Sequence, residues 1–318
     1  MKKGTCIMNT YISVDVGGTQ IRVAVYPETG TQALRIKKVA TVGEGTPLER
    51  LIATVHDQMS PDENVKAIGI CVPGPVDAEK GVISFCANLE GWENLPMRDI
   101  LQAEFNVPVV IGNDANLAAL GEWKYGAGRG HKNVVYFTIS TGVGGGVVAD
   151  NRLLHGHKGL ATELGHTFLE PDSHYPCGCG QFGHLESFSS GTGIAYYANE
   201  QLNLGRESIL QGKGKVNARD VAEAAQAGDA LALETYARAS KFLAYGIVNT
   251  LHTFNPSAVI FGGGVSMVGD LLFAPIKEAL PKLVYSQDYL DDLHFAMAEL
   301  GDDVGLLGCL ALAHMETE

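Results

Sequence analysis

Two histidines and two cysteines lie close together in the second half of the chain, at His166, Cys177, Cys179 and His184. Thiolate sulfur and imidazole nitrogen are ligands that zinc prefers, and a structural zinc ion takes four of them. Glycines at 178, 180 and 183 would let a short loop wrap around one ion. A redox pair is disfavoured because it needs Cys-x-x-Cys at a helix start. A loop that binds no metal is the other alternative, and the sequence does not exclude it. The pattern favours a structural zinc site.

Three glycine-rich turns follow residues typical of buried strands. They contain, in chain order, Asp15, Gly17, Gly18 and Thr19; then Thr141, Gly142 and Gly144; then Gly262, Gly263 and Gly264. Backbone N–H groups in such turns can approach phosphates closely, and threonine adds a hydroxyl donor. Asp15, at the end of its strand, could hold a hydrated Mg²⁺. These turns predict an ATP site, with ordinary turns as the alternative.

The surroundings of these turns exclude two common nucleotide motifs. None of them ends in Gly-Lys-Ser/Thr, as a Walker A loop does. A strand follows each of the first two turns, where a dinucleotide fingerprint would require a helix. A flat adenine or ribose could lie on the third turn, "FGGGV" at 261 to 265, which is otherwise a plain strand-to-helix turn.

A pair of polar residues, Asn113-Asp114, stands at a predicted strand end just before a predicted helix. Ligands of α/β sheets bind at such strand ends. Asp114 could act as a general base on a substrate hydroxyl, with Asn113 bound to a neighbouring hydroxyl. The alternative is that Asp114 only caps the helix. Beside two phosphate-binding turns, the catalytic interpretation gains weight because phosphoryl transfer needs a base, a metal and phosphate donors.

The composition limits the possible function classes and the cellular location. With 318 residues the chain is long enough for two domains. The net charge of −13 and the absence of a basic cluster exclude a nucleic-acid binder. No apolar run reaches 18 residues and no signal peptide stands at the start, so we expect no membrane partner and a cytoplasmic location. Met8 is an alternative start to Met1.

The predicted elements must place these residues together. Two strand–turn–strand units lie about 125 residues apart, a spacing that suggests duplicated domains rather than a solenoid. We expect a small α/β domain at 1–117 and a large one at 118–303 that holds the zinc loop. Helices are predicted over 47–60, 229–254 and 305–315. The last of these, extended to about 304–318, is expected to pack back on the small domain.

Eight motifs in order give the sequence a resemblance to the ROK family of repressors, open reading frames and sugar kinases. They are "DVGGT", "VPGPVD", "NLEGW", "NDANLAALGE", "GVGGG", "ELGH", "CGCGQFGHLE" and "FGGGV". The resemblance covers nearly the whole chain. It implies a two-domain actin-like ATPase (ribonuclease H-like) fold, with an ATP-dependent sugar kinase site in the cleft between the domains. The family usually has a third cysteine where this chain has His184, a change that keeps four zinc ligands.

The resemblance also implies roles by position. Asp114 would be the base for the 6-hydroxyl of a hexose, with glucose preferred. The other sugar contacts would come from Gly74, Asn88, Asn113, Glu163, His166 and Glu186. His166 would bind zinc through one ring nitrogen and the sugar through the other. The cofactors would be structural Zn²⁺ and Mg²⁺ with ATP, and the chain would form a homodimer or homotetramer.

Two alternative functions stay open at this point. An N-acetylmannosamine or N-acetylglucosamine kinase would differ only around the sugar's 2-position, which the sequence does not reveal. A non-catalytic sugar-sensing protein would share the fold but would be expected to lose Asp114 or a glycine turn. Both features are present in this chain.

Overall fold

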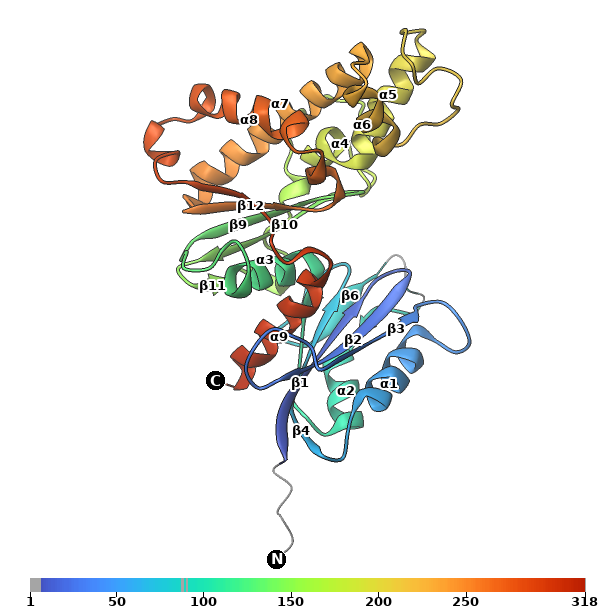
Figure 1. Ribbon diagram of the computed structural model, residues 1–318, viewed down its shortest axis with the longest axis vertical. Helices are drawn as coiled ribbons and strands as arrows, with labels where there is room; N and C mark the ends of the chain where they lie inside the picture. Colours follow the sequence, from blue (N-terminus) through green and yellow to red (C-terminus); the bar gives the residue numbers. More distant parts are fainter. Residues whose placement is uncertain (1–6, 87–88, 90, 318) are drawn as a thin grey trace, which may run out of the picture. The chain divides into compact units, whose positions relative to one another are not determined.

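The computed structural model describes residues 7–86, 89 and 91–317 (Figure 1). Its contacts divide the chain into two compact units, which are described separately. Unit 1 consists of Met1–Gly130, Leu153–Thr162 and Glu299–Glu318, and unit 2 of His131–Arg152 and Glu163–Ala298. Both units combine a five-stranded sheet with helices, so the predicted α/β class is confirmed.

The main sheet of unit 1 has the strand order β3-β2-β1-β4-β8. Its strands are β1 (Met8–Val16), β2 (Gln20–Pro27), β3 (Arg35–Ala40), β4 (Glu63–Val72) and β8 (Val109–Asn113). β1 and β2 form the hairpin around the first glycine turn, while β1, β4 and β8 run parallel. The carboxyl ends of these three strands therefore meet at one edge of the sheet. A small second sheet contains β5 (Val76–Asp77), β6 (Val82–Phe85) and β7 (Glu93–Leu95).

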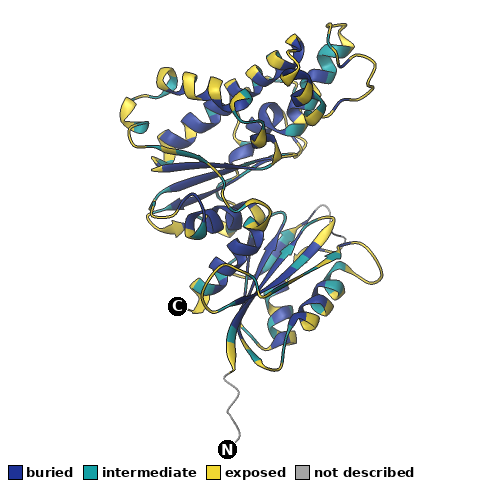
Figure 2. Cartoon of the chain, viewed as in Figure 1, coloured by how far each residue is buried: buried dark blue, intermediate teal, exposed yellow. Residues whose placement is uncertain are grey.

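Helices cover the main sheet of unit 1 because each strand has apolar residues on both faces. Leu51 of α1 and Leu101 of α2 belong to one buried cluster, and Leu306 and Leu310 of α9 belong to another, with Tyr26 of β2. In Figure 2 the strands of this sheet are mostly dark blue, whereas α1 keeps an exposed outer face. The helices are α1 (Pro47–Gln58), α2 (Met97–Phe105), α3 (Asp114–Tyr125) and α9 (Val304–Thr317).

The sheet of unit 2 has the order β11-β10-β9-β12-β13. Its strands are β9 (Val134–Ile139), β10 (Val143–Ala149), β11 (Arg152–Leu153), β12 (Ala258–Gly262) and β13 (His294–Met297). β9 and β10 form the hairpin around the second glycine turn, and β9 runs parallel to β12, which carries the third turn at its end. The second and third turns thus lie at the same edge of this sheet.

The helices of unit 2 are α4 (Leu185–Ser189), α5 (Gly191–Asn203), α6 (Ala218–Gln226), α7 (Ala230–Phe254) and α8 (Asp270–Leu283). Short 3-10 turns are η1 (His157–Gly159) and η5 (Gly301–Asp303) in unit 1, and η2 (Leu164–His166), η3 (Gly264–Val268) and η4 (Gln287–Tyr289) in unit 2. Within the described ranges, no helix combines the length and apolar character needed to cross a membrane.

The two sheets have matching orders, each built from a hairpin followed by parallel strands, as the expected duplication would produce. The predicted boundary at residue 117 falls inside α3, which belongs entirely to unit 1. Division of the chain into separately folding domains with the limits 1–117 and 118–303 stays a prediction.

Candidate active site and metal centre

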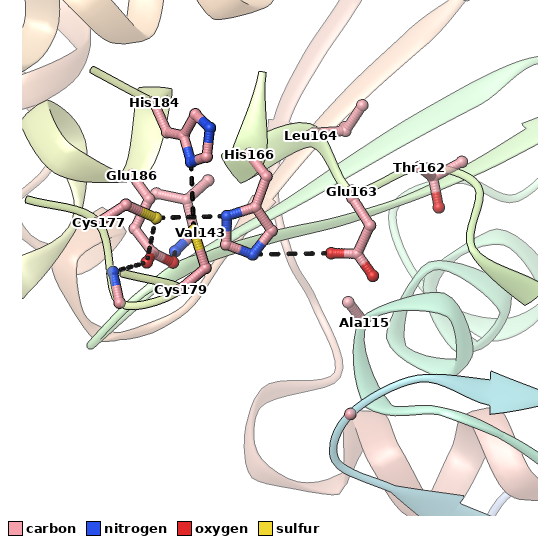
Figure 3. A network of polar contacts seen from close by, with 12 residues as sticks. Ala115, Val143, Thr162, Glu163, Leu164, His166, Cys177, Cys179, His184 and Glu186 are labelled. Atoms are coloured by element: carbon pink, nitrogen blue, oxygen red, sulfur yellow. Dashed lines mark hydrogen bonds and ion pairs between the residues drawn. The ribbon is translucent and has the colours of Figure 1, made fainter. Parts of the chain in front are cut away.

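The four predicted zinc ligands lie together in unit 2. One ligand atom from each of His166, Cys177, Cys179 and His184 lies within 4.8 Å of the other three (Figure 3). The Cys177 Sγ is 3.3 Å from His166 Nδ1, and the Cys179 Sγ is 3.4 Å from His184 Nδ1. Two sulfurs and two imidazole nitrogens at these separations match the donor set and the tetrahedral size of a zinc site.

Local backbone contacts bring these ligands together. His166 ends η2, and His184 precedes α4 and pairs with Phe168 in an isolated bridge. The segment between them turns tightly, because the Cys177 N–H donates to the Gln181 carbonyl and the Gly180 N–H donates to the Cys177 carbonyl. The short loop that the glycines predicted is therefore present.

The protonation of the ligands depends on burial. Burial raises the pKa of the Cys177 thiol, and a hydrogen bond to Glu186 raises it further. Without a cation this sulfur keeps its proton at neutral pH, so metal binding must release a proton. Burial lowers the pKa of His184, which favours the neutral imidazole that binds metals.

Glu186 connects the metal loop to the second glycine turn. Its Oε1 accepts hydrogen bonds from the Gly178 N–H at 2.9 Å and the Cys177 Sγ at 3.1 Å. Its Oε2 accepts from the Val143 N–H at 2.9 Å (Figure 3). A Cβ on Gly142 would collide with this carboxylate. The sequence placed Glu186 among the sugar contacts, a role that stays a prediction, but it did not foresee this bridge.

The two nitrogens of His166 face in different directions. Nδ1 lies beside Cys177, and Nε2 is 4.0 Å from the exposed Glu163 carboxylate (Figure 3). A metal on Nδ1 would leave Nε2 and Glu163 available to hydroxyl groups. This arrangement is consistent with the double role expected of His166.

The polar residues of unit 1 gather at the carboxyl edge of its sheet. Asn113 is the N-cap of α3: its Oδ1 accepts from the Ala115 and Asn116 N–H groups, and its Nδ2 donates to the Gly74 carbonyl at 3.0 Å. The alternative in which Asp114 caps the helix is therefore wrong, because the preceding residue takes that position. Asp114 is the first residue of α3 and is exposed.

The first glycine turn has two partners that the sequence did not reveal. Arg22 stands opposite Asp15 in the β1–β2 ladder, and its Nη2 lies 2.5 Å from Asp15 Oδ2. Burial alone would lower the pKa of Arg22, but the hydrogen bond to Asp15 outweighs it and the pKa is raised. Thr41 secures the turn by donating its hydroxyl to the Gly17 carbonyl at 2.7 Å. The sequence did contain a signal for this ion pair: Asp15 and Arg22 have opposite charges and lie at equal distances from the tip of the predicted hairpin, where cross-strand neighbours meet.

A cavity of about 650 Å³ opens beside the second and third glycine turns of unit 2. Thr141 and Gly264, both predicted to bind ATP, line it. The start of α5 is joined to the turn, since the Thr192 hydroxyl donates to the Thr141 carbonyl at 2.9 Å. The volume suits a nucleoside. The sequence missed other lining residues because they form no recognisable motif, among them Ser140, Lys215, Asn217, Arg219 and Tyr236.

The remaining predicted nucleotide residues lie close to these turns. Gly144 pairs with Thr138 in the β9–β10 ladder, and Gly262 ends β12. Gly263 has a positive φ of 86°, and a Cβ there would collide with the Ile139 carbonyl. Gly18 and Thr19 are exposed at the tip of the first turn. Asn88, a predicted sugar contact, lies outside the described residues.

Comparison with known proteins places the chain in a family. Residues 11–316 match the ROK family. The chain belongs to the ROK family. A glucokinase of Halalkalibacterium halodurans is 37% identical over 316 residues, covering 94% of this chain and 93% of that protein.

Solved structures of ROK proteins share the fold. A ROK hexokinase from Thermus thermophilus has a TM-score of 0.82 and 32% identity, covering 96% of this chain and 98% of that one. A ROK family glucokinase from Streptomyces griseus, in complex with glucose and AMPPNP, has a TM-score of 0.75 and 33% identity, with 96% and 99% covered. The expected actin-like ATPase fold of ROK sugar kinases is thus confirmed.

Proposed function

We propose that this ROK protein is an ATP-dependent glucose kinase that transfers the γ-phosphoryl group to the sugar's 6-hydroxyl. The observation that carries the proposal is the match to glucokinases along almost the whole chain, at 33–37% identity. The glucokinase from S. griseus holds glucose and an ATP analogue in its structure. Each unit of this chain contains the side chains that such a reaction needs.

Asp114 is the proposed general base. Its carboxylate is exposed at the start of α3, directly after β8. A carboxylate that accepts the hydroxyl proton as the phosphoryl group arrives makes the sugar oxygen a better nucleophile.

Asn113 and Gly74 are proposed to orient the sugar beside the base. The Asn113 side chain is held between the Gly74 carbonyl and the first N–H groups of α3, so its direction is fixed before a ligand arrives. One N–H of its amide remains to donate to a hydroxyl. Gly74 has a φ of 87° and a Cβ there would collide with the Phe85 carbonyl, so only glycine fits.

In unit 2 we propose that the 650 Å³ cavity binds the nucleoside part of ATP and that the glycine turns face its phosphates. In unit 1 the Asp15 turn is proposed to contact the phosphates as well, with Asp15 orienting the water shell of Mg²⁺. Bound Mg²⁺ would neutralise charge on the phosphates. Arg22 holds the Asp15 carboxylate in place for this task through their ion pair.

The proposed zinc ion is structural. His166, Cys177, Cys179 and His184 would hold it, and its full coordination shell would leave no position for a reacting group. Its contribution would be to order the loop that carries His166 and Glu186. Glu163, His166 and Glu186 are the proposed sugar contacts of unit 2, and a cytoplasmic location and a dimer or tetramer complete the proposal.

An ATP-consumption assay across glucose, mannose, fructose, allose, N-acetylglucosamine and N-acetylmannosamine tests this function. We expect glucose to give the highest kcat/KM. A highest value for an N-acetylated hexosamine would replace glucose as the substrate, and no ATP consumption with any sugar would favour a non-catalytic sugar sensor.

A further inference from the structure

An arginine of α7 in unit 2 is surrounded by aromatic rings. The Arg238 guanidinium carbon lies 4.0 Å from the ring centroid of Tyr175 and 4.5 Å from that of Tyr197. The rings of Phe188 and Phe242 lie 4.9 and 5.2 Å away. Such faces attract a cation but accept none of its N–H groups in the manner of a carboxylate.

The donors of Arg238 are unused within the described part of the chain. No hydrogen bond or ion pair joins Arg238 to any described residue. Burial lowers the pKa of its guanidinium, while Glu170 and Glu200 attract it from beyond ion-pair distance. The group still stays charged at neutral pH, and a half-buried guanidinium without an acceptor is costly.

Two carboxylates bound to the tyrosines that stack on Arg238, Glu200 and Glu234, have other partners. Glu200 accepts from the Tyr175 hydroxyl at 2.8 Å and pairs with His174 at 2.8 Å.

Glu234 is occupied in the same way. It accepts from the Tyr197 hydroxyl at 2.7 Å and pairs with Arg206 at 2.7 Å. Both tyrosines that stack on Arg238 therefore turn their hydroxyl groups toward carboxylates, and neither carboxylate neutralises the arginine.

Arg238 lines a cavity of about 510 Å³. Lys241, one turn further along α7, lines it too, and within the described ranges Lys241 has no ion pair. Glu170 and Glu234 complete the charged part of the wall. Because Glu234 is paired with Arg206, the charged groups of this wall with no hydrogen bond or ion pair to a described residue are Arg238, Lys241 and the exposed Glu170 carboxylate.

We propose that this cavity is a binding site for the oxyanion group of a small molecule, either a phosphate monoester or a carboxylate. Arg238 binds the oxyanion with its planar fork, which matches two oxygens of either group. Lys241 adds a second positive charge from the same helix face, and Glu170 limits the affinity by repulsion. The site is separate from the nucleotide cavity, with which it shares no lining residue.

The position of this site gives it a route to the metal loop. Tyr175 stacks on Arg238, and its carbonyl accepts from the Gly183 N–H within the loop that carries Cys177 and Cys179. An anion that orders Arg238 would therefore restrain the ring next to the loop. An effect of this restraint on sugar binding or turnover rests on the proposed kinase function, whereas anion binding itself does not.

Calorimetric titration of the full chain with inorganic phosphate and, separately, with sodium acetate tests the proposal. Ionic strength is held constant with chloride, and glucose and a non-hydrolysable ATP analogue are present to occupy the other sites. We expect saturable binding of at least one anion. Phosphate alone would identify a phosphate site, and acetate as well would identify a general carboxylate and phosphate site.

Variants assign the binding to this cavity. Arg238→Gln should raise the Kd at least about tenfold, as expected for loss of a charge-assisted contact. Arg238→Lys should raise it less, because the positive charge is kept. Lys241→Ala, at an exposed position, should raise it about threefold. Glu170→Gln should tighten binding by about twofold, because a repelling charge is removed. A general loss of folding would not produce this opposite sign.

Lys132→Ala is the matched control. Lys132 is exposed in unit 2 and lines neither this cavity nor the neighbouring one that shares Lys241, so its loss removes the same charge without touching Arg238 or Lys241. Its Kd should stay within about twofold of the parent because screened surface charges act weakly over distance. Absence of binding by both anions, or a Kd that is the same in the parent, Lys241→Ala and Glu170→Gln proteins, would overturn the proposal. Neither result would bear on the kinase assay.

Discussion

Asp114 illustrates how one position in the chain decides between two roles. Asn113 takes the helix cap with its own side chain, and this leaves the next carboxylate exposed at the start of α3. Asp114 Oδ1 also accepts a hydrogen bond from the Ala115 N–H at 2.8 Å. A substitution that keeps this oxygen, such as Asp114→Asn, therefore tests the chemistry with little change at the start of α3.

Replacement of Asp114 by Asn should lower kcat by at least about 10²-fold, the lower range for a positioned general base. Glucose binding should persist because the amide keeps the shape of the side chain. Steady-state kinetics and equilibrium glucose binding measure the two effects. Turnover close to the parent value would remove Asp114 from the mechanism.

The hydrogen bonds of Glu186 lead to a prediction about stability, in addition to its proposed contact with the sugar. Its two oxygens accept from Val143 on one side and from Gly178 and Cys177 on the other. In Glu186→Gln the amide nitrogen must face a donor, so we expect the free energy of unfolding to fall by about 1.5–3 kcal/mol. Urea denaturation of the variant gives this value.

The matched control for this variant is Glu170→Gln, an exposed position on the same segment. It should change the free energy of unfolding by less than about 0.5 kcal/mol. Equal stability of the two variants would show that the bridge between the metal loop and the glycine turn contributes nothing.

At the scale of the element, the metal loop has little regular structure of its own. Between η2 and α4 its described pairings are the bridges Phe168↔His184 and Pro176↔Phe182. Two of the four ligands, Cys177 and His184, are buried. Because the loop has so little pairing of its own, we expect it to depend on the proposed ion more than a helix or strand would.

We expect elemental analysis to find about one zinc per chain, as four closely spaced ligands indicate. Removal of the ion with a chelator should lower the melting temperature and make the 167–184 segment sensitive to protease. Added zinc should reverse both changes. A metal-free protein with the parent's melting temperature and full activity would contradict a structural metal.

The strand-to-helix turn after β12 gives a second prediction at this scale. Gly263 combines a positive φ with a backbone neighbour where a Cβ would lie, whereas a Cβ at Gly264 would meet nothing within 4 Å. Gly263→Ala should reduce the free energy of unfolding by about 2 kcal/mol or more, and Gly264→Ala by about 1 kcal/mol or less. Thermal unfolding of the pair measures the difference, and equal effects would contradict the steric argument.

At the scale of the molecule, the prediction concerns the segment that returns to unit 1. α9 covers one face of its sheet, where Leu306 and Leu310 pack with Tyr11 and Tyr26. A chain that stops at Asp303 would expose this apolar face. We expect such a chain to aggregate or to bind a hydrophobic dye, as measured by sedimentation and dye fluorescence, and a monodisperse protein with the parent's melting temperature would contradict this expectation.

The sequence predicted the parts of the molecule that depend on local pattern. The hairpin at Gly17 and Gly18, the helices at 47–60 and 229–254 and the close approach of four zinc ligands all follow from spacing and residue type. Periodicity and turn chemistry act over a few residues, so they can be read without a structure.

What the sequence did not reveal depends on pairing between distant segments. Arg22 contacts Asp15 because the strand register places them opposite each other. Glu186 contacts Val143, which is 43 residues earlier in the chain. The cap of α3 shifted by one residue for a different reason: Asn and Asp are nearly equal as caps, so propensity could not choose between them. Arg238 stayed unnoticed because its aromatic neighbours come from four separate stretches of chain.

The late return of α9 has a consequence for biosynthesis. A ribosome completes all of unit 2 by residue 298, but unit 1 lacks its covering helix until residues 304–317 emerge. Until α9 emerges, Tyr11 and Tyr26 of the nascent β1–β2 hairpin lack the helix that covers them in the finished unit. At a synthesis rate of about 5–20 residues per second, that exposure lasts roughly 15 to 60 seconds. During this interval the uncovered apolar face is open to chaperones and to aggregation, so the yield of folded protein should respond to chaperone supply more than the stability of the finished fold would suggest.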